Sequence, residues 1–197
     1  MNFLAHALFA GNADADRIGG VLGDFVKGYL PAGLLPDLAS GVALHRAIDS
    51  YADRHPAFAA SRARISPARR RVGGILVDLF YDHLLARDWV IRGRGTLEDY
   101  TAQLYALLRD YPGPLPQQAR EVAARMRAHD WLGSYRSVAA VGRAIDQMAV
   151  YRLRRANSLA GGIEEFIADA DGFASDFRLF LPDALSFAAD WRAARGA

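Results

Sequence analysis

Apolar residues recur along most of this chain at spacings of three and four, which is typical of one buried face of an α-helix. Valine and isoleucine never alternate with polar residues over the length of a strand, so no β-strand is expected. The links between apolar segments are short enough for neighbouring helices to pack against one another. The pattern therefore predicts an all-α protein, a helical bundle that forms a single domain over residues 1–197.

Capping residues and prolines mark where the expected helices begin and end. Ser66 followed by Pro67 is typical of a helix start, and Thr96 with Asp99 resembles a capping box. Pro182 is expected to interrupt the last helical segment, because proline lacks the amide that an internal helix position donates. The helices predicted from these signals are residues 3–10, 12–28, 36–54, 66–90, 96–109, 116–130, 138–155, 163–180 and a final helix that ends near residue 195.

The expected helix over residues 36–54 carries two groups suited to metal binding. His45 and Asp49 lie one helical turn apart on the same face, beside apolar residues. Neutral imidazole and carboxylate are ligands that divalent metals accept in proteins. Two such groups at this spacing can reach one ion.

The expected helix over residues 66–90 is apolar on nearly every side, which predicts a central, buried element. It nevertheless carries Asp78, Asp82 and His83, and buried ionisable groups need partners. Arg46 and Arg71 are candidate partners for one or two of these groups. A metal held jointly by this helix and the helix over residues 36–54 would satisfy several of them at once.

Three glycines lie just before Asp24, at positions 19, 20 and 23. Glycine is unfavourable inside a helix by about 1 kcal/mol relative to alanine, so this run suggests a close helix approach or a backbone near a ligand. The run is not a phosphate-binding loop, because no strand precedes it and no Gly-Lys-Ser/Thr follows.

Four of the five histidines fall within the first 83 residues, among aspartates at helical spacing. For any one of these residues a buried hydrogen bond between histidine and aspartate is the simpler explanation, but the set as a whole favours a metal. His129 and Asp130 form the only adjacent His-Asp pair, and they are interpreted as a helix end because they stand alone. His55 before Pro56 is interpreted as a helix end as well.

The composition is that of an ordinary globular protein, with 52% hydrophobic and 23% charged residues. The absence of cysteine excludes disulfides and thiolate metal sites. No apolar run reaches the roughly 18–20 residues that span a bilayer, and the N-terminus lacks the basic region of a signal peptide. A cytoplasmic location is expected.

The basic residues are nearly all arginine and are clustered. Residues 61–71 contain five arginines and no acid, and a second cluster lies at residues 152–155. Such clusters suit an acidic partner or a phosphate, although a solvated helix face would have the same pattern.

The spacing of several motifs resembles that of a known family, the acyl carrier protein phosphodiesterases, also called acyl-carrier-protein hydrolases. The resemblance covers roughly the first 90 residues and continues more weakly towards the C-terminus. Ala52 departs from the family pattern, in which a hydroxyl residue is usual. The matching motifs are Met1-Asn2-Phe3-Leu4-Ala5-His6, Gly23-Asp24-Phe25-Val26-Lys27-Gly28, His45-Arg46-Ala47-Ile48-Asp49, Asp53, Arg70-Arg71-Val72, and Asp78 with Asp82-His83.

This resemblance implies a divergent HD-type metal-dependent phosphohydrolase, all-helical and using Mn²⁺. The implied reaction removes 4′-phosphopantetheine from the serine of holo acyl carrier protein and gives the apo form. Asp24, His45, Asp82 and His83 are assigned to hold the metal, so we expect the first three to converge. Proton transfer is assigned to an uncoordinated aspartate or histidine, Asp49 or His6, which also occupy positions that match the family motifs.

The partner implied by the resemblance is the acyl carrier protein, which is strongly acidic; no nucleic acid or membrane partner is expected. The residues assigned to bind this substrate are Arg62, Arg64, Arg69, Arg70, Arg71 and Lys27. Such contacts should act on the association rate and weaken with salt.

Two alternative functions stay open. A phosphohydrolase of the same class could act on a small nucleotide or another phosphoester, and activity without carrier protein would favour it. A non-catalytic helical binding module could use its histidines and aspartates to close a buried network, and the absence of bound metal would favour that.

Overall fold

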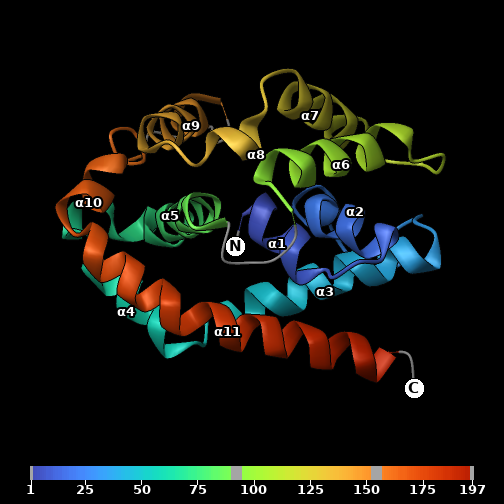
Figure 1. Cartoon of the computed structure of the whole chain (residues 1–197), viewed down its shortest axis with the longest axis horizontal. Helices are drawn as coiled ribbons and strands as arrows, with labels where there is room; N and C mark the ends of the chain where they lie inside the picture. Colours follow the sequence, from blue (N-terminus) through green and yellow to red (C-terminus); the bar gives the residue numbers. More distant parts are fainter. Residues whose placement is uncertain (1, 90–94, 152–156, 196–197) are drawn as a thin grey trace.

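The computed structural model describes residues 2–89, 95–151 and 157–195, and across them the chain is helical. These residues form eleven α-helices and two short 3₁₀ helices, with no strand in the described ranges (Figure 1). The all-α prediction is therefore confirmed. The elements are α1 (Phe3–Phe9), α2 (Asp14–Leu22), η1 (Gly23–Phe25), α3 (Pro36–Ala52), α4 (Pro56–Arg64), η2 (Pro67–Val72), α5 (Gly73–Arg87), α6 (Leu97–Asp110), α7 (Gln117–Ala128), α8 (Trp131–Ser134), α9 (Val138–Tyr151), α10 (Ile163–Ala168) and α11 (Ala170–Arg195).

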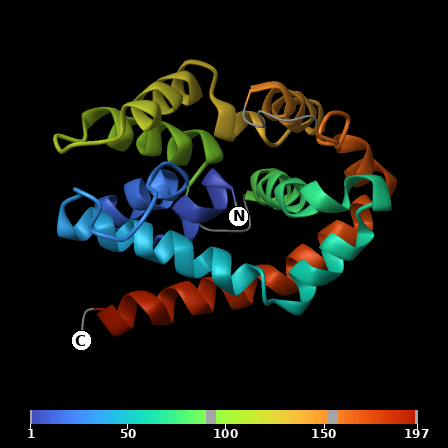
Figure 2. The same ribbon diagram turned by 180° about the vertical axis from the view of Figure 1, so that it is seen from behind.

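Helix α5 is the centre of the core, as its all-round hydrophobicity predicts. It packs against α1, α4, α9 and α11, and Figures 1 and 2 show it enclosed between these elements. Leu76, Phe80 and Leu84 on this helix are completely buried. Burying side chains of this size stabilises the fold by about 1.5–3 kcal/mol each before conformational entropy is counted.

Helices α2 and α3 approach each other unusually closely, and glycine makes this possible. A Cβ on Gly19 would lie 2.5 Å from the carbonyl carbon of Gly41, which is closer than real side chains come. A Cβ on Gly20 would lie 2.9 Å from the His6 carbonyl oxygen, so α1 is close to α2 as well. The expected close helix approach at the glycine run is therefore confirmed, and it places α1, α2 and α3 in contact beside α5.

The start of the central helix differs from the prediction. Ser66 makes no side-chain cap; its backbone amide and its hydroxyl donate hydrogen bonds to Glu165. Residues 67–72 form the 3₁₀ helix η2, and α5 begins only at Gly73. The capping signal at Thr96 is confirmed, since the Asp99 amide donates to Thr96 Oγ1 at 3.0 Å.

Two helices at the lower edge of Figure 1 were not expected in their observed form. Helix α4 was missed because its nine residues bury only Ala57, Phe58 and Ser61, too short a pattern to read as a face. Helix α11 continues through Pro182 without a break. Proline is tolerated there because Pro182 and Arg178, whose carbonyl loses its partner, are both exposed to water. Among the described helices, none has the length and apolar character required to span a membrane.

Candidate metal centre

Two imidazoles and one carboxylate meet where α1 packs beside α3. His6 Nε2 lies 3.1 Å from Asp49 Oδ1, and His45 Nε2 lies 3.2 Å from Asp49 Oδ2. One potential ligand atom from each of the three residues falls within 4.8 Å of the other two. Among the described residues this is the one such group of three or more histidines and acids, and we call it the His6–His45–Asp49 group.

The orientation of His45 is fixed by the backbone of α2. Its Nδ1 lies 2.7 Å from the carbonyl oxygen of Gly20. Because a carbonyl can only accept, Nδ1 carries the hydrogen, and Nε2 is directed towards Asp49. Gly23 lies directly against this ring, and a Cβ at that position would overlap it.

His6 is buried completely and stacks on His45, with ring centroids 3.6 Å apart and planes 18° apart. Burial and then the neighbouring charge of His45 lower the pKa of His6 to about 3, although the hydrogen bond with Asp49 opposes this. The imidazole is therefore neutral near pH 7, which is the form that binds metals. Its Nδ1 is buried and makes no hydrogen bond within the residues the structure describes.

Asp49 joins the two rings and connects the group to solvent. Its side chain is 42% exposed, whereas the imidazoles of His6 and His45 are 0% and 3% exposed. Partial burial acts to raise the pKa of Asp49, but the hydrogen bonds from His45 and His6 outweigh it and hold that pKa well below its usual range. The carboxylate is therefore ionised and faces two imidazoles, of which His6 is neutral.

The donor set fits a divalent cation. Metal–ligand bonds of about 2.1 Å place neighbouring ligand atoms about 3 Å apart, close to the two separations between imidazole and carboxylate in this group. His45 Nε2 also lies 3.2 Å from a carboxylate oxygen, so a cation could be held between the two atoms.

Two further acids border the group. Asp24 lies in η1, next to the Gly23 that contacts His45, and is half-buried. Burial raises the pKa of Asp78 on α5, and the negative charges of Asp49 and Asp24 raise it further. The three carboxylates therefore influence one another, although Asp24 and Asp78 lie outside the group of three.

The structure does not bring Asp82 or His83 into this group. Asp82 accepts hydrogen bonds from the backbone amides of Leu4 and Ala5 at the start of α1, at 3.0 and 2.9 Å. Burial raises the pKa of Asp82 to about 7, although these two amides act to lower it. Asp24, His45 and Asp82 were expected to converge, whereas the described residues whose ligand atoms lie within 4.8 Å of one another are His6, His45 and Asp49.

His83 lies on a different side of α5. Its Nδ1 is 2.7 Å from the Tyr135 carbonyl oxygen, and its ring meets the edge of Phe166 with centroids 5.0 Å apart. Burial lowers the pKa of His83. The imidazole therefore packs towards α8 and α10, while Asp82 next to it is directed towards α1.

The remaining histidines are at helix ends, as predicted. His55 precedes α4, where its Nδ1 accepts the Ala57 amide and its Nε2 lies 3.1 Å from Asp183 Oδ2. His129 is exposed at the end of α7, and Asp130 caps α8 by accepting the Gly133 amide. None of these groups joins the His6–His45–Asp49 group.

Several arginines expected to bind substrate are engaged within the chain. Arg64 forms ion pairs with Asp169 and Asp176 at 2.6 and 2.7 Å, and Arg69 lies 3.3 Å from Glu165. These acids belong to α10, α11 and the link between them. The absence of acids from residues 61–71 therefore does not mean that the arginines of this segment lack acidic partners in the folded protein. Arg62 is exposed, and its guanidinium lies 3.7 Å from the carboxylate of Asp53.

The other expected substrate-binding residues lie on the surface. Arg70, Arg71 and Lys27 are exposed. The guanidinium of Arg46, a candidate partner for the acids of α5, donates to the carbonyl oxygens of Val26 and Gly28, and so holds the loop after η1. The arginine cluster at residues 152–155 lies outside the described residues.

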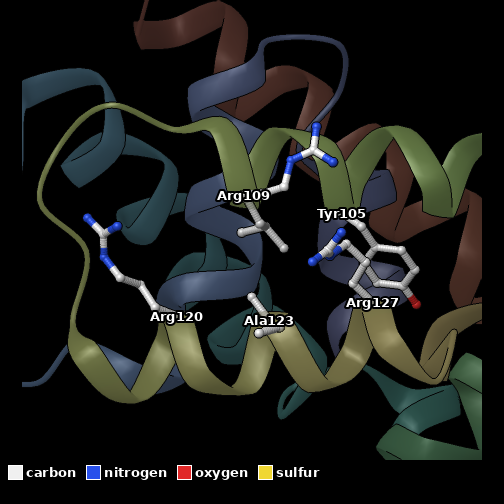
Figure 3. Close-up of a pocket in the computed structure, with 7 residues that line it drawn as sticks. Tyr105, Arg109, Arg120, Ala123 and Arg127 are labelled. Atoms are coloured by element: carbon white, nitrogen blue, oxygen red, sulfur yellow. The ribbon is translucent and has the colours of Figure 1, made fainter.

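A cavity between α6 and α7 has a different chemistry from the metal group. Figure 3 shows three arginines around an apolar floor, and no imidazole or carboxylate lines it. Two of these arginines are engaged nearby, Arg109 with Asp110 and Arg120 with the Gly113 carbonyl. The cavity therefore offers no set of metal ligands.

Sequence reasoning placed His45 and Asp49 on one helix face within reach of one ion, and it assigned His6 to the site without pairing it with them. The spacing of His45 and Asp49 was the available signal, because it puts both on one helix face. No local pattern could pair them with His6, which comes from another helix 39 residues before His45 in the sequence.

Comparison with known proteins gives a consistent result. The family model described as acyl carrier protein phosphodiesterase matches residues 1–184. A Serratia proteamaculans protein named acyl carrier protein phosphodiesterase is 31% identical over 166 residues, which cover 84% of this chain and 86% of that protein. Proteins of the same name from Yersinia pestis and Escherichia coli O6:H1 are each 31% identical, over 82% and 78% of this chain and 83% and 80% of their own lengths. No solved structure matches.

Proposed function

Because this chain belongs to the acyl carrier protein phosphodiesterase family, we propose that it hydrolyses the phosphodiester that joins 4′-phosphopantetheine to the serine of holo acyl carrier protein. Water adds to phosphorus, the serine oxygen leaves with a proton, and the products are apo carrier protein and free 4′-phosphopantetheine. The observation that carries the proposal within this chain is the His6–His45–Asp49 group, which has the donor chemistry of a metal-dependent hydrolase.

We assign the group to a divalent metal, with Mn²⁺ as the first candidate and Asp24 as an additional oxygen ligand. A bound ion of this kind neutralises phosphoryl oxygens and lowers the pKa of bound water towards about 7. The low pKa values of Asp49 and His6 support ligand roles for both, since groups so weakly basic are poor proton acceptors near neutral pH. The proposal therefore moves these two residues from proton transfer to metal binding.

The substrate is proposed to approach from the Asp49 side. That carboxylate is the member of the group with substantial exposure, and the two imidazoles lie behind it. The Gly20 carbonyl orients His45, and the stacking of the two rings excludes water from the inner side of the group. The acidic carrier protein would then meet the exposed cations Lys27, Arg70 and Arg71, which have no ion pair within the described part of the chain.

The direct test is to incubate the protein with holo acyl carrier protein and Mn²⁺ and to follow the intact mass of the carrier protein. The proposal predicts loss of the prosthetic group with wild-type protein and with His129→Ala, and none with His45→Ala or after chelation. Hydrolysis of a small phosphodiester with an unchanged carrier protein would instead support the small-substrate phosphohydrolase. Protein purified without chelator that contains no metal and shows no metal-dependent activity would support the binding module.

A further inference from the structure

Helix α1, which carries His6, has no cap of its own. It contains only seven residues, and Asn2 at its N-cap position makes no side-chain capping hydrogen bond. The first amides of any helix have no acceptor inside the helix, and every residue of α1 is buried from water. An acceptor must therefore come from elsewhere in the fold.

Asp82 supplies that acceptor from the centre of α5. Its two carboxylate oxygens accept the amides of Leu4 and Ala5, which lie 78 and 77 residues away in the sequence. These are the second and third residues of α1, the positions that a local capping side chain normally reaches. The carboxylate is completely buried, and in its ionised form its negative charge also complements the positive end of the helix.

The capped amides lead directly to the metal group. His6 follows Ala5 in the chain, and its imidazole must reach both Asp49 and the face of His45. A short helix that lost its acceptors at this end would fray there first, and the imidazole would move with the backbone. Asp82 is thus hydrogen-bonded to the backbone directly before His6.

We propose that Asp82 is a positioning residue that holds the N-terminus of α1 and thereby places His6, and that it is not a ligand of the metal. The inference rests on the proposed metal site for its functional consequence. Two observations support it over a ligand role: both oxygens already accept amides of α1, and Asp82 lies outside the group of atoms that could share one ion.

A double-mutant cycle tests the proposal. If Asp82 affects metal binding only through His6, substituting Asp82 should no longer change Mn²⁺ affinity once the His6 imidazole has been removed. The variants are Asp82→Ala and Asp82→Asn, each made alone and in a His6→Ala background. Binding of Mn²⁺ alone is measured by calorimetry on the full chain. We expect Asp82→Ala to weaken Mn²⁺ binding about tenfold or more when His6 is present and less than twofold when it is absent.

Asp82→Asn keeps one carbonyl oxygen as an acceptor for the two amides. It should therefore weaken Mn²⁺ binding less than Asp82→Ala does. It also replaces alanine in the cycle if Asp82→Ala does not fold. Asp183→Ala is the matched control, because Asp183 likewise holds a histidine, His55, next to a helix start. It should lower stability and leave Mn²⁺ affinity unchanged.

Equal losses of Mn²⁺ affinity in both backgrounds would make Asp82 a ligand and overturn the proposal. Loss of stability with unchanged affinity would make it a structural residue only and would overturn it as well. NMR spectra of the His6 imidazole in the metal-free protein separate this inference from the proposed function. The ring signals should shift in Asp82→Asn even if the wild type binds no Mn²⁺, and unchanged signals would contradict the positioning role.

Discussion

Histidine and aspartate occur together in two regions of this protein, and their surroundings are opposite. At the α1–α3 contact, His6 and His45 are buried, stacked and directed at the carboxylate of Asp49. At the α7–α8 junction, His129 and Asp130 are adjacent in the sequence, but the imidazole is exposed and the carboxylate caps α8.

The difference shows that adjacency in sequence is a poor guide to a shared site. Neighbouring residues on a helix point about 100° apart, whereas residues one turn apart share a face. Burial then makes the first region chemically distinctive, because it keeps His6 neutral and leaves it few partners besides Asp49 and His45. The predictions below test this contrast from the largest expected effect to the smallest.

The largest effect should separate His45 from His129. His45→Ala removes one of the three proposed metal ligands. Mutation of a residue that only orients a metal ligand typically lowers activity roughly 10–100-fold. We expect His45→Ala to lower turnover of holo carrier protein by more than that. His129→Ala should stay within about twofold of wild type. Steady-state kinetics on both folded variants measure this. Equal losses in the two variants would mean that the exposed dipeptide is functional.

A steric change beside the group should have the next largest effect. Gly23→Ala places a methyl group against the His45 ring, so the ring or the backbone must shift. We expect a loss of about 1–3 kcal/mol in the free energy of unfolding, together with weaker metal binding. Gly74→Ala is the control, because a Cβ at that position meets no atom within 4 Å. Thermal unfolding and Mn²⁺ titration of both variants would show whether the effect is specific to the His45 side.

The pH dependence of stability should report the buried imidazole. His6 has a pKa of about 3 in the folded protein against the usual 6.5, so below pH 6.5 the unfolded chain binds a proton that the folded chain excludes. His6 should therefore lower the stability of the metal-free protein by about 2 kcal/mol at pH 5, whereas Asp82, whose pKa is raised to about 7, acts in the opposite direction over the same pH range. The His6 contribution is isolated by denaturant unfolding of wild type and His6→Gln from pH 7 to pH 5. As the pH falls, His6→Gln should gain about 2 kcal/mol of stability relative to wild type. A difference that does not change with pH, or that is found in His129→Gln instead, would contradict the assignment.

The smallest effect is expected in residues 61–71, where exposed arginines lie close in sequence to arginines that form ion pairs within the chain. Arg70→Glu with Arg71→Glu should raise KM for the carrier protein several-fold and change kcat little, because exposed docking charges bind substrate and transition state alike. Arg64→Glu should instead reduce stability, since it breaks ion pairs with Asp169 and Asp176. Kinetics across a salt series distinguish the two. A KM insensitive to both substitution and salt would place carrier-protein docking elsewhere.

Features encoded within one helix could be predicted from the sequence. The shared face of His45 and Asp49, the central position of α5 and the close approach at Gly19 each follow from residues a few positions apart. Helix α4 was missed because it buries few residues, and α11 was divided at Pro182 because exposure of that turn cannot be seen locally.

Features that depend on contacts between distant helices could not be predicted. The pairing of His6 with Asp49 joins α1 to α3, and the capping of α1 by Asp82 spans 77 residues or more. Arg64 and Arg69 meet acids about 100 residues later, which turns part of the expected docking surface into ion pairs within the chain, while Arg70 and Arg71 stay exposed. In each case the residue types were suggestive, but only the tertiary fold determines their partners.

The central claim is that His6, His45 and Asp49 share one divalent ion. Pulsed EPR of the Mn²⁺-loaded protein tests it directly, because nitrogen nuclei bound to Mn²⁺ couple to its unpaired electrons. The account predicts couplings from two imidazole nitrogens in the wild type and in His129→Ala, and from one in His45→Ala or His6→Ala. Bound Mn²⁺ without imidazole coupling, or two couplings that persist in His45→Ala, would contradict it.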